Sequence, residues 1–255
     1  MKRLLLFDLD GTLLRTDKTI SERTFTAIEN SKKKGYLIGI STSRSETNCT
    51  AFLGRLEPDI LITSGGALIK KGEDYIFKEV FSPERTLELI HAARKICGEN
   101  VEITIDTVDK HYWNYKVDPH TVDKSWGDSV WTDFRDFHEE ALKMCVEILD
   151  EKKAGELAGV LKDCDSVRFS DSFWYKFTKK NVTKEHAVKV ICDYCQISMD
   201  DMIAFGDDYA DIGMLQMAGI GIAMGNATYE VKEAADLVID TNDNDGIAIY
   251  LDNEL

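Results

Sequence analysis

Short apolar runs recur at both ends of the chain, and stretches with helical periodicity separate them. The first run, Leu4–Phe7, stops at two carboxylates one residue apart, Asp8 and Asp10. Short apolar runs bounded by polar turns are typical of strands buried on both faces of a sheet. The strands predicted in this way cover residues 4–7, 36–40, 59–63, 202–205, 220–224 and 237–239. The helices predicted between them cover residues 21–34, 184–194, 230–235 and 246–251. This alternation predicts an α/β fold with a doubly wound parallel sheet.

The pattern changes between residues 82 and 179, where apolar and polar residues alternate and aromatic residues become frequent. Helices are predicted over residues 83–96 and 152–161, and strands over 101–105, 144–149, 166–170 and 174–178. The aromatic residues include Tyr112, Trp113, Tyr115, Trp126 and Trp131, and we expect the tryptophans to be core residues. We therefore predict a core of residues 1–81 and 180–255 with an inserted α+β unit of residues 82–179, one sheet face of which is free to meet something else.

Composition narrows the class of protein. The 255 residues are 44% hydrophobic and 30% charged, and the formal net charge is −15. Such an acidic chain is poorly suited to nucleic acid or anionic membranes, because phosphate groups are held by clustered Lys and Arg. The run before Asp8 is too short for a signal peptide, and no apolar stretch approaches the ~20 residues of a membrane span. We expect a cytoplasmic protein with six reduced cysteines.

Polar residues directly follow several of the predicted strands. The candidate site residues are Asp8, Asp10, Thr42, Arg44, Lys184, Asp207, Asp208 and Asp211. Ligands of open α/β sheets bind at the carboxyl ends of the strands, so we expect these side chains to meet at one edge. Crowded carboxylates repel one another unless a cation or a shared proton intervenes. Mg²⁺ is usually held by carboxylates and substrate phosphate, and a lysine with a hydroxyl completes a phosphate cradle.

The segment Asp8-Leu-Asp10-Gly-Thr12 resembles the nucleophile motif of the haloacid dehalogenase-like (HAD) hydrolases. The other motifs of that family follow in order, as Thr42, then Val182-Thr183-Lys184, then Gly206-Asp207-Asp208 with Asp211. Segments around Gly219, Ala223–Ala227, Ala235-Asp236 and Asp245-Gly246 are similar to the Cof-type subfamily. The inserted α/β cap of that subfamily matches the middle of the chain in position and size.

The resemblance implies a phosphomonoesterase that hydrolyses a small phosphorylated metabolite, such as a sugar phosphate, through an aspartyl-phosphate. Asp8 would be the nucleophile, and Asp10 the general acid and base. Mg²⁺ would be bound by Asp8, the backbone carbonyl of Asp10 and Asp207, and Asp211 would hold its waters. The cap would select the substrate.

Thr42 and Lys184 would bind phosphate oxygens in this scheme. Arg44 is either a phosphate ligand or an ion-pair partner of acidic residues, and Asp208 is either a metal ligand or a surface acid. The chain departs from the family pattern at three positions, with Ser43 in place of Gly, Gly65 in place of Asn and Ala210 in place of Asn.

Other functions stay open at this point. A phosphomutase or other phosphotransferase of the same fold differs only in the acceptor, and the changes at Gly65 and Ala210 motivate a phosphate-ester binding protein without catalysis. A phospho-accepting receiver has a similar acidic cluster, but it lacks the large insertion. Cys192 and Cys195 are expected within a helix rather than in a zinc site. The five histidines show no metal-ligand spacing, and His111 and His120 are considered only as candidate substrate contacts.

Overall fold

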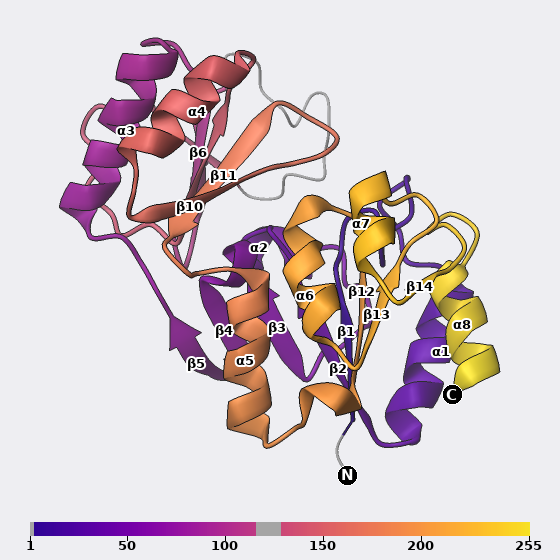
Figure 1. Cartoon of the computed structure of the whole chain (residues 1–255). Coiled ribbons are helices and arrows are strands. Elements are labelled where there is room, and N and C mark those ends of the chain that lie inside the picture. The colour runs from indigo at the N-terminus through magenta and orange to yellow at the C-terminus, as the bar shows by residue number, and fades with distance from the viewer. Residues whose placement is uncertain (1–2, 116–128) are drawn as a thin grey trace.

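The computed structural model describes residues 3–115 and 129–255, which form two β-sheets (Figure 1). The larger sheet has the strand order β14-β13-β12-β1-β2-β3-β4-β5. β1 (Arg3–Phe7) lies between β12 (Met202–Gly206) and β2 (Tyr36–Ser41), parallel to both. The other strands are β3 (Ile60–Thr63), β4 (Leu68–Lys71), β5 (Asp74–Lys78), β13 (Ile220–Ala223) and β14 (Leu237–Val238). The parallel strands confirm the predicted fold class, whereas the antiparallel pair β4 and β5 was not predicted.

Helices cover both faces of this sheet, because successive side chains of a strand point to opposite faces. Leu4 and Leu6 of β1 pack on one side, and Leu5 and Phe7 pack on the other, all fully buried. The first side is covered by α5 (Lys184–Cys195), α6 (Ile212–Met217) and α7 (Tyr229–Ala234). The second side is covered by α1 (Glu22–Lys33), α2 (Glu46–Thr50) and α8 (Gly246–Glu254). The four apolar residues of β1 therefore belong to two separate cores.

Capping side chains determine where the helices begin. Ser21 accepts a hydrogen bond from the amide of Thr24, and Thr183 accepts one from the amide of His186. An N-cap hydroxyl pairs an amide that has no partner within the helix, which contributes about 1 kcal/mol. Thr183 thereby places Lys184 at the first residue of α5. None of the helices in the described ranges combines the length and the apolar character that a membrane crossing needs.

The second sheet is built by residues between β5 and α5, in the strand order β10-β11-β9-β6-β7-β8. Its strands are β6 (Ile103–Asp106), β7 (His111–Trp113), β8 (Ser129–Trp131), β9 (Lys143–Glu147), β10 (Cys164–Arg168) and β11 (Trp174–Lys179). α3 (Pro83–Cys97) and α4 (Glu151–Val160) lie on its outer side in Figure 1, over an apolar core. The opposite face, here called the inner face, carries the buried polar residues Thr104, Asp106, Lys143, Lys176 and Thr178. Hydrogen bonds from this face reach residues at the edge of the larger sheet.

The aromatic stretch differs partly from expectation. Trp113 is buried as predicted, but Trp131 is 61% exposed, so the expectation of a core residue is wrong for it. The reason is that Trp131 belongs to β8, a strand at the edge of the second sheet. Trp126 and His120 lie outside the described residues.

Gly66 is expected to be far less tolerant of alanine than Gly72. Both residues have positive φ, +106° and +58°, where an L-residue is disfavoured by about 1 kcal/mol. A Cβ on Gly66 would also overlap the carbonyl of Thr183 at the start of α5, whereas a Cβ on Gly72 would meet nothing within 4 Å. Urea unfolding should show a loss of about 2 kcal/mol or more for Gly66→Ala and of about 1 kcal/mol for Gly72→Ala. Equal losses would contradict this packing argument.

Candidate active site

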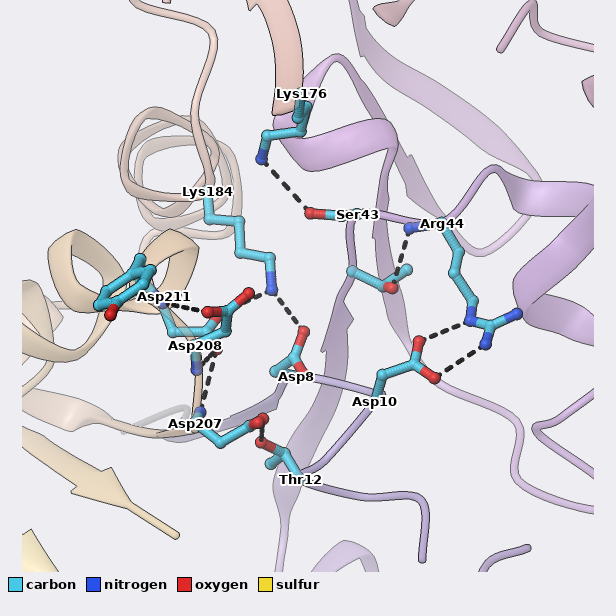
Figure 2. A network of polar contacts seen from close by, with 12 residues as sticks. Asp8, Asp10, Thr12, Ser43, Arg44, Lys176, Lys184, Asp207, Asp208 and Asp211 are labelled. Carbon is cyan, nitrogen blue, oxygen red and sulfur yellow. Dashed lines mark hydrogen bonds and ion pairs between the residues drawn. The ribbon is translucent and has the colours of Figure 1, made fainter. Parts of the chain in front are cut away.

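The carboxyl ends of three parallel strands bring the predicted residues to one edge of the larger sheet (Figure 2). Asp8 follows β1, Thr42 follows β2 and Asp207 follows β12. The short helical turn η5 (Tyr209–Asp211) adds Asp211, and the first turn of α5 adds Lys184. Residues from the two ends of the chain therefore meet at one place, as the sequence predicts.

Three carboxylates at this edge form a compact cluster. Asp8, Asp207 and Asp211 each place one oxygen within 4.8 Å of the others. Asp211 is fully buried, and its Oδ2 accepts the backbone amides of Asp207 and Asp208, each at 3.1 Å. The hydroxyl of Thr12 donates to Oδ1 of Asp207 at 2.6 Å. These hydrogen bonds fix the positions of the Asp207 and Asp211 carboxylates.

Asp208 lies next to the cluster without joining it. Its Oδ1 accepts the backbone amides of Tyr209 at 2.7 Å and of Ser170 at 3.1 Å. The side chain therefore caps η5 and connects it to the loop before β11. In this structure Asp208 is neither part of the acidic cluster nor a free surface acid.

Lys184 is the cation of the cluster. Its Nζ donates to Asp8 Oδ1 and, at 2.6 Å, to Asp211 Oδ1, and the side chain is only 2% exposed. Burial acts to lower the pKa of Lys184, but the carboxylates of Asp211 and Asp8 outweigh it and raise that pKa. The ammonium therefore stays charged and offsets part of the repulsion between the two carboxylates.

Lys184 alone does not neutralise three carboxylates. Burial and the neighbouring Asp211 raise the pKa of Asp8 well above its ordinary value, although Lys184 opposes them. Burial and Asp211 also raise the pKa of Asp207 to about 8. A divalent cation would remove this penalty, and carboxylate oxygens are the ligands that hard cations prefer. The residues present therefore fit a divalent metal ion.

Asp10 lies beside this cluster in a separate ion-pair group. Arg44 Nε donates to Asp10 Oδ2 at 2.5 Å and Arg44 Nη2 to Oδ1 at 2.8 Å, while Lys18 Nζ reaches Oδ1 at 2.9 Å. Burial works to raise the pKa of Asp10, but the hydrogen bonds and charges of Arg44 and Lys18 lower it to about 2. Asp10 is therefore ionised in this conformation. Arg44 was expected either to bind phosphate or to pair with acidic residues, and in this structure it pairs with Asp10.

Thr42 directly follows β2 at the same edge of the sheet. It is buried, its amide donates to the carbonyl of Ile62, and its hydroxyl accepts the backbone amide of Arg44 at 3.1 Å. The hydroxyl proton is not used in that bond, so Thr42 keeps a donor for an anion.

The inner face of the second sheet brings two further lysines to this edge. Lys143 donates to the carbonyl of Ser43 and forms an ion pair with Asp106 at 3.1 Å. Lys176 donates to Ser43 Oγ at 3.3 Å (Figure 2). His111, a candidate substrate contact, is instead held through Nδ1 by Asp106 at 2.6 Å and is buried.

Several of these residues were missed in the sequence. Thr12 stands within the first motif, but nothing there indicates that its hydroxyl pairs with Asp207. Lys176 occurs in a predicted strand and Lys143 directly precedes one, and a polar residue of an alternating strand normally faces solvent. The sequence does not show that these two lysines are buried, because their burial depends on which face of the second sheet meets the larger sheet.

Comparisons with known proteins identify relatives of nearly the whole chain. A family model for haloacid dehalogenase-like hydrolases matches residues 5–251. The Bacillus subtilis protein named 5-amino-6-(5-phospho-D-ribitylamino)uracil phosphatase YcsE is 30% identical over 249 residues, or 96% of this chain and 93% of that protein. The solved structure of a HAD subclass IIB sugar phosphatase matches with a TM-score of 0.85 and 26% identity, over 98% of each chain. Another, from a phosphoryl-transfer superfamily, gives a TM-score of 0.88 and 26% identity over 99% of this chain and 98% of that one.

Asp207→Asn is expected to make the stability of the metal-free protein less sensitive to pH. Because the pKa of Asp207 is raised to about 8 from 3.8, the folded wild type binds an extra proton between these values and loses stability as the pH rises through them. The amide of the Asp207→Asn variant cannot ionise. Between about pH 5 and about pH 8, the free energy of unfolding of the variant should therefore fall by about 1 kcal/mol less than that of the wild type, or by a larger margin. Urea unfolding with EDTA measures this. Asp193→Asn, an exposed position on α5, should follow the wild type, and identical pH profiles for all three proteins would refute the argument.

Proposed function

The chain belongs to the haloacid dehalogenase-like hydrolase family and is a phosphatase of that family, and we propose that it hydrolyses a small phosphorylated metabolite through an aspartyl-phosphate on Asp8. The observation that carries the proposal is the buried contact of Asp8 with Lys184, beside Asp207 and Asp211. One carboxylate is thereby placed next to a cation that can also hold the phosphate it attacks. The names of the similar proteins, a ribitylaminouracil phosphate phosphatase and a sugar phosphatase, support a small phosphorylated substrate.

Asp8, Asp207 and Asp211 would hold Mg²⁺, with Asp211 acting directly or through water, and the backbone carbonyl of Asp10 would complete the protein ligands. Bound there, Mg²⁺ would supply the positive charge that allows one anion to approach another. Burial and the neighbouring Asp211 raise the pKa of Asp207 to about 8, which supports this assignment, because a bound cation would stabilise the ionised carboxylate there.

The chemistry would proceed in two displacements. An oxygen of Asp8 forms a bond to phosphorus while the bond to the leaving-group oxygen breaks, and that oxygen takes a proton from Asp10. In the second step Asp10 accepts a proton from water, whose oxygen attacks phosphorus and releases Asp8 and phosphate. Thr42 and Lys184 would bind the equatorial oxygens in both steps.

The ion pair of Asp10 with Arg44 places a condition on this mechanism. A carboxyl whose pKa is about 2 cannot carry the proton that the leaving group needs. Arg44 and Lys18 must therefore release Asp10 before the first step. Arg44 would then be free to meet the substrate phosphate, which reconciles its two predicted roles.

We further propose that residues 82–179 act as a cap over the site. The inner face of the second sheet supports this role, since Lys143 and Lys176 contact Ser43, the residue after Thr42. The receiver alternative is wrong for a phosphatase of this family. A phosphomutase stays an alternative, but no contact in the described residues favours it.

Asp8→Asn is expected to abolish phosphate release while the fold is retained, because the amide keeps the shape but removes the nucleophile. A screen of phosphorylated metabolites with Mg²⁺, scored by released phosphate, should first identify a substrate and show loss of turnover with EDTA. Rapid mixing followed by acid quench should then trap phosphate on Asp8. Asp10→Asn should slow turnover by about 10²-fold or more. Phosphate on another residue, or full activity of Asp8→Asn, would disprove the assignment.

Lys184→Ala is expected to lower kcat/KM by about 10²-fold or more, equivalent to roughly 3 kcal/mol of transition-state stabilisation. The matched control is Lys180→Ala, since Lys180 is more than half exposed and pairs with Asp165 at 2.6 Å, away from the acidic cluster. Its kcat/KM should change less than about threefold. Similar losses at both positions would mean that general positive charge, and not one placed ammonium, serves the phosphate.

A further inference from the structure

Among the residues that the structure describes, no carboxylate pairs with Lys176, which distinguishes it from the other cations at the edge of the larger sheet. Lys184 pairs with Asp8 and Asp211, Arg44 pairs with Asp10, and Lys143 pairs with Asp106. Within the described residues, the polar contact of Lys176 Nζ is the hydroxyl of Ser43 at 3.3 Å, a neutral group.

The position of Lys176 is energetically unfavourable without an anion. The residue is only 3% exposed, and burying an unpaired charge costs several kcal/mol. Burial and the ammonium groups of Lys184 and Lys143 lower the pKa of Lys176 to about 8. An anion beside Nζ would remove this penalty. The side chain cannot turn away from the larger sheet, because its direction is fixed by the alternation of β11. Its neighbour Phe177 belongs to the core under α3 and α4, so Lys176 must point from the inner face.

Gly65 makes room for this ammonium. It lies in η1 (Ser64–Gly66), the turn that follows β3, and a Cβ placed on it would stand 2.6 Å from Lys176 Nζ. Any side chain at residue 65 would therefore compete with Lys176 for the same space. Because residue 65 has no side chain, the ammonium of Lys176 fits beside Ser43, where the second sheet meets the larger one.

Lys176 is set apart from the groups that would hold the transferred phosphate. Asp8 and Lys184 lie on the side of the acidic cluster, while Lys176 reaches Ser43 from the second sheet (Figure 2). A group bound by Lys176 would thus belong to the part of the substrate that leaves with the ester oxygen.

We propose that the substrate carries a second anionic group on its leaving portion, a carboxylate or a second phosphate, and that Lys176 with Ser43 binds that group. The inference rests on the proposed phosphatase function and narrows its substrate class. A neutral sugar or polyol would leave the ammonium as unpaired as it is now. An anionic leaving portion would balance the charge of Lys176.

Matched substrate pairs test the proposal on the full chain with Mg²⁺. The first pair, 3-phosphoglycerate and glycerol 3-phosphate, compares a carboxylate with a neutral group. The second pair, fructose 1,6-bisphosphate and fructose 1-phosphate, compares a second phosphate with a neutral hydroxyl. We expect kcat/KM to be about tenfold or more higher for the anionic member of at least one pair. The pair that shows the preference distinguishes the carboxylate from the phosphate.

Substitution of Lys176 then connects the preference to this residue. Lys176→Met, which keeps the length and removes the charge, should reduce the preference to about one, mainly through KM, and Lys176→Arg should restore part of it. Lys180→Met, on the exposed turn after β11, should keep the wild-type ratio. Hydrolysis of both members without preference, or a preference that survives Lys176→Met, would overturn the inference and leave the phosphatase function intact. Absence of hydrolysis with every phosphate ester in the wider screen would instead overturn the proposed function, and this inference with it.

Discussion

The buried ammonium of Lys184 is the group on which the rest of the site depends. It touches two of the three carboxylates in the acidic cluster, and without it Asp8 and Asp211 would repel each other in a place that water barely reaches. Its location follows from local features of the chain. Thr183 caps α5 so that Lys184 is the first helical residue, and the turn containing Gly66 packs on the backbone just before it. A cation at a helix N-terminus is unfavourable by itself, so the helix tolerates Lys184 because the carboxylates are there.

The central part of this arrangement could be predicted from the sequence because it follows from strand geometry alone. Apolar runs that end in polar residues identify β1, β2 and β12, and parallel strands bring their carboxyl ends to one edge, so Asp8, Thr42 and Asp207 had to meet. The pairing of Asp10 with Arg44 could not be predicted in the same way. Arg44 was expected either to bind phosphate or to pair with acidic residues, and side-chain direction decides between these. Nor could the antiparallel β4 and β5 be predicted, since their sequence mixes charged and apolar residues as an exposed loop would.

The contacts made by the second sheet were the least predictable feature. Alternation shows that β9 and β11 each have an apolar and a polar face, but it does not show where the polar face is directed. Burial of Lys143 and Lys176 arises because that face meets the edge of the larger sheet through polar groups, among them the hydroxyl of Ser64 on Asp106 at 2.9 Å. Contacts of this kind are less apolar than the two cores they join, which is typical of units that move relative to each other.

The central position of β1 has a consequence for the order in which the chain is made. A ribosome releases β1 long before β12, its neighbour on one side, because the whole second sheet is encoded between them. Until β12 is made, the side of β1 that pairs with it in the complete sheet stays open, so Asp8 lies at the end of an exposed edge strand. The second sheet draws its strands from one contiguous stretch and can close by itself in the meantime. The acidic cluster can therefore form only late in biosynthesis, once Met202–Gly206 pairs with β1 and brings Asp207 to Asp8.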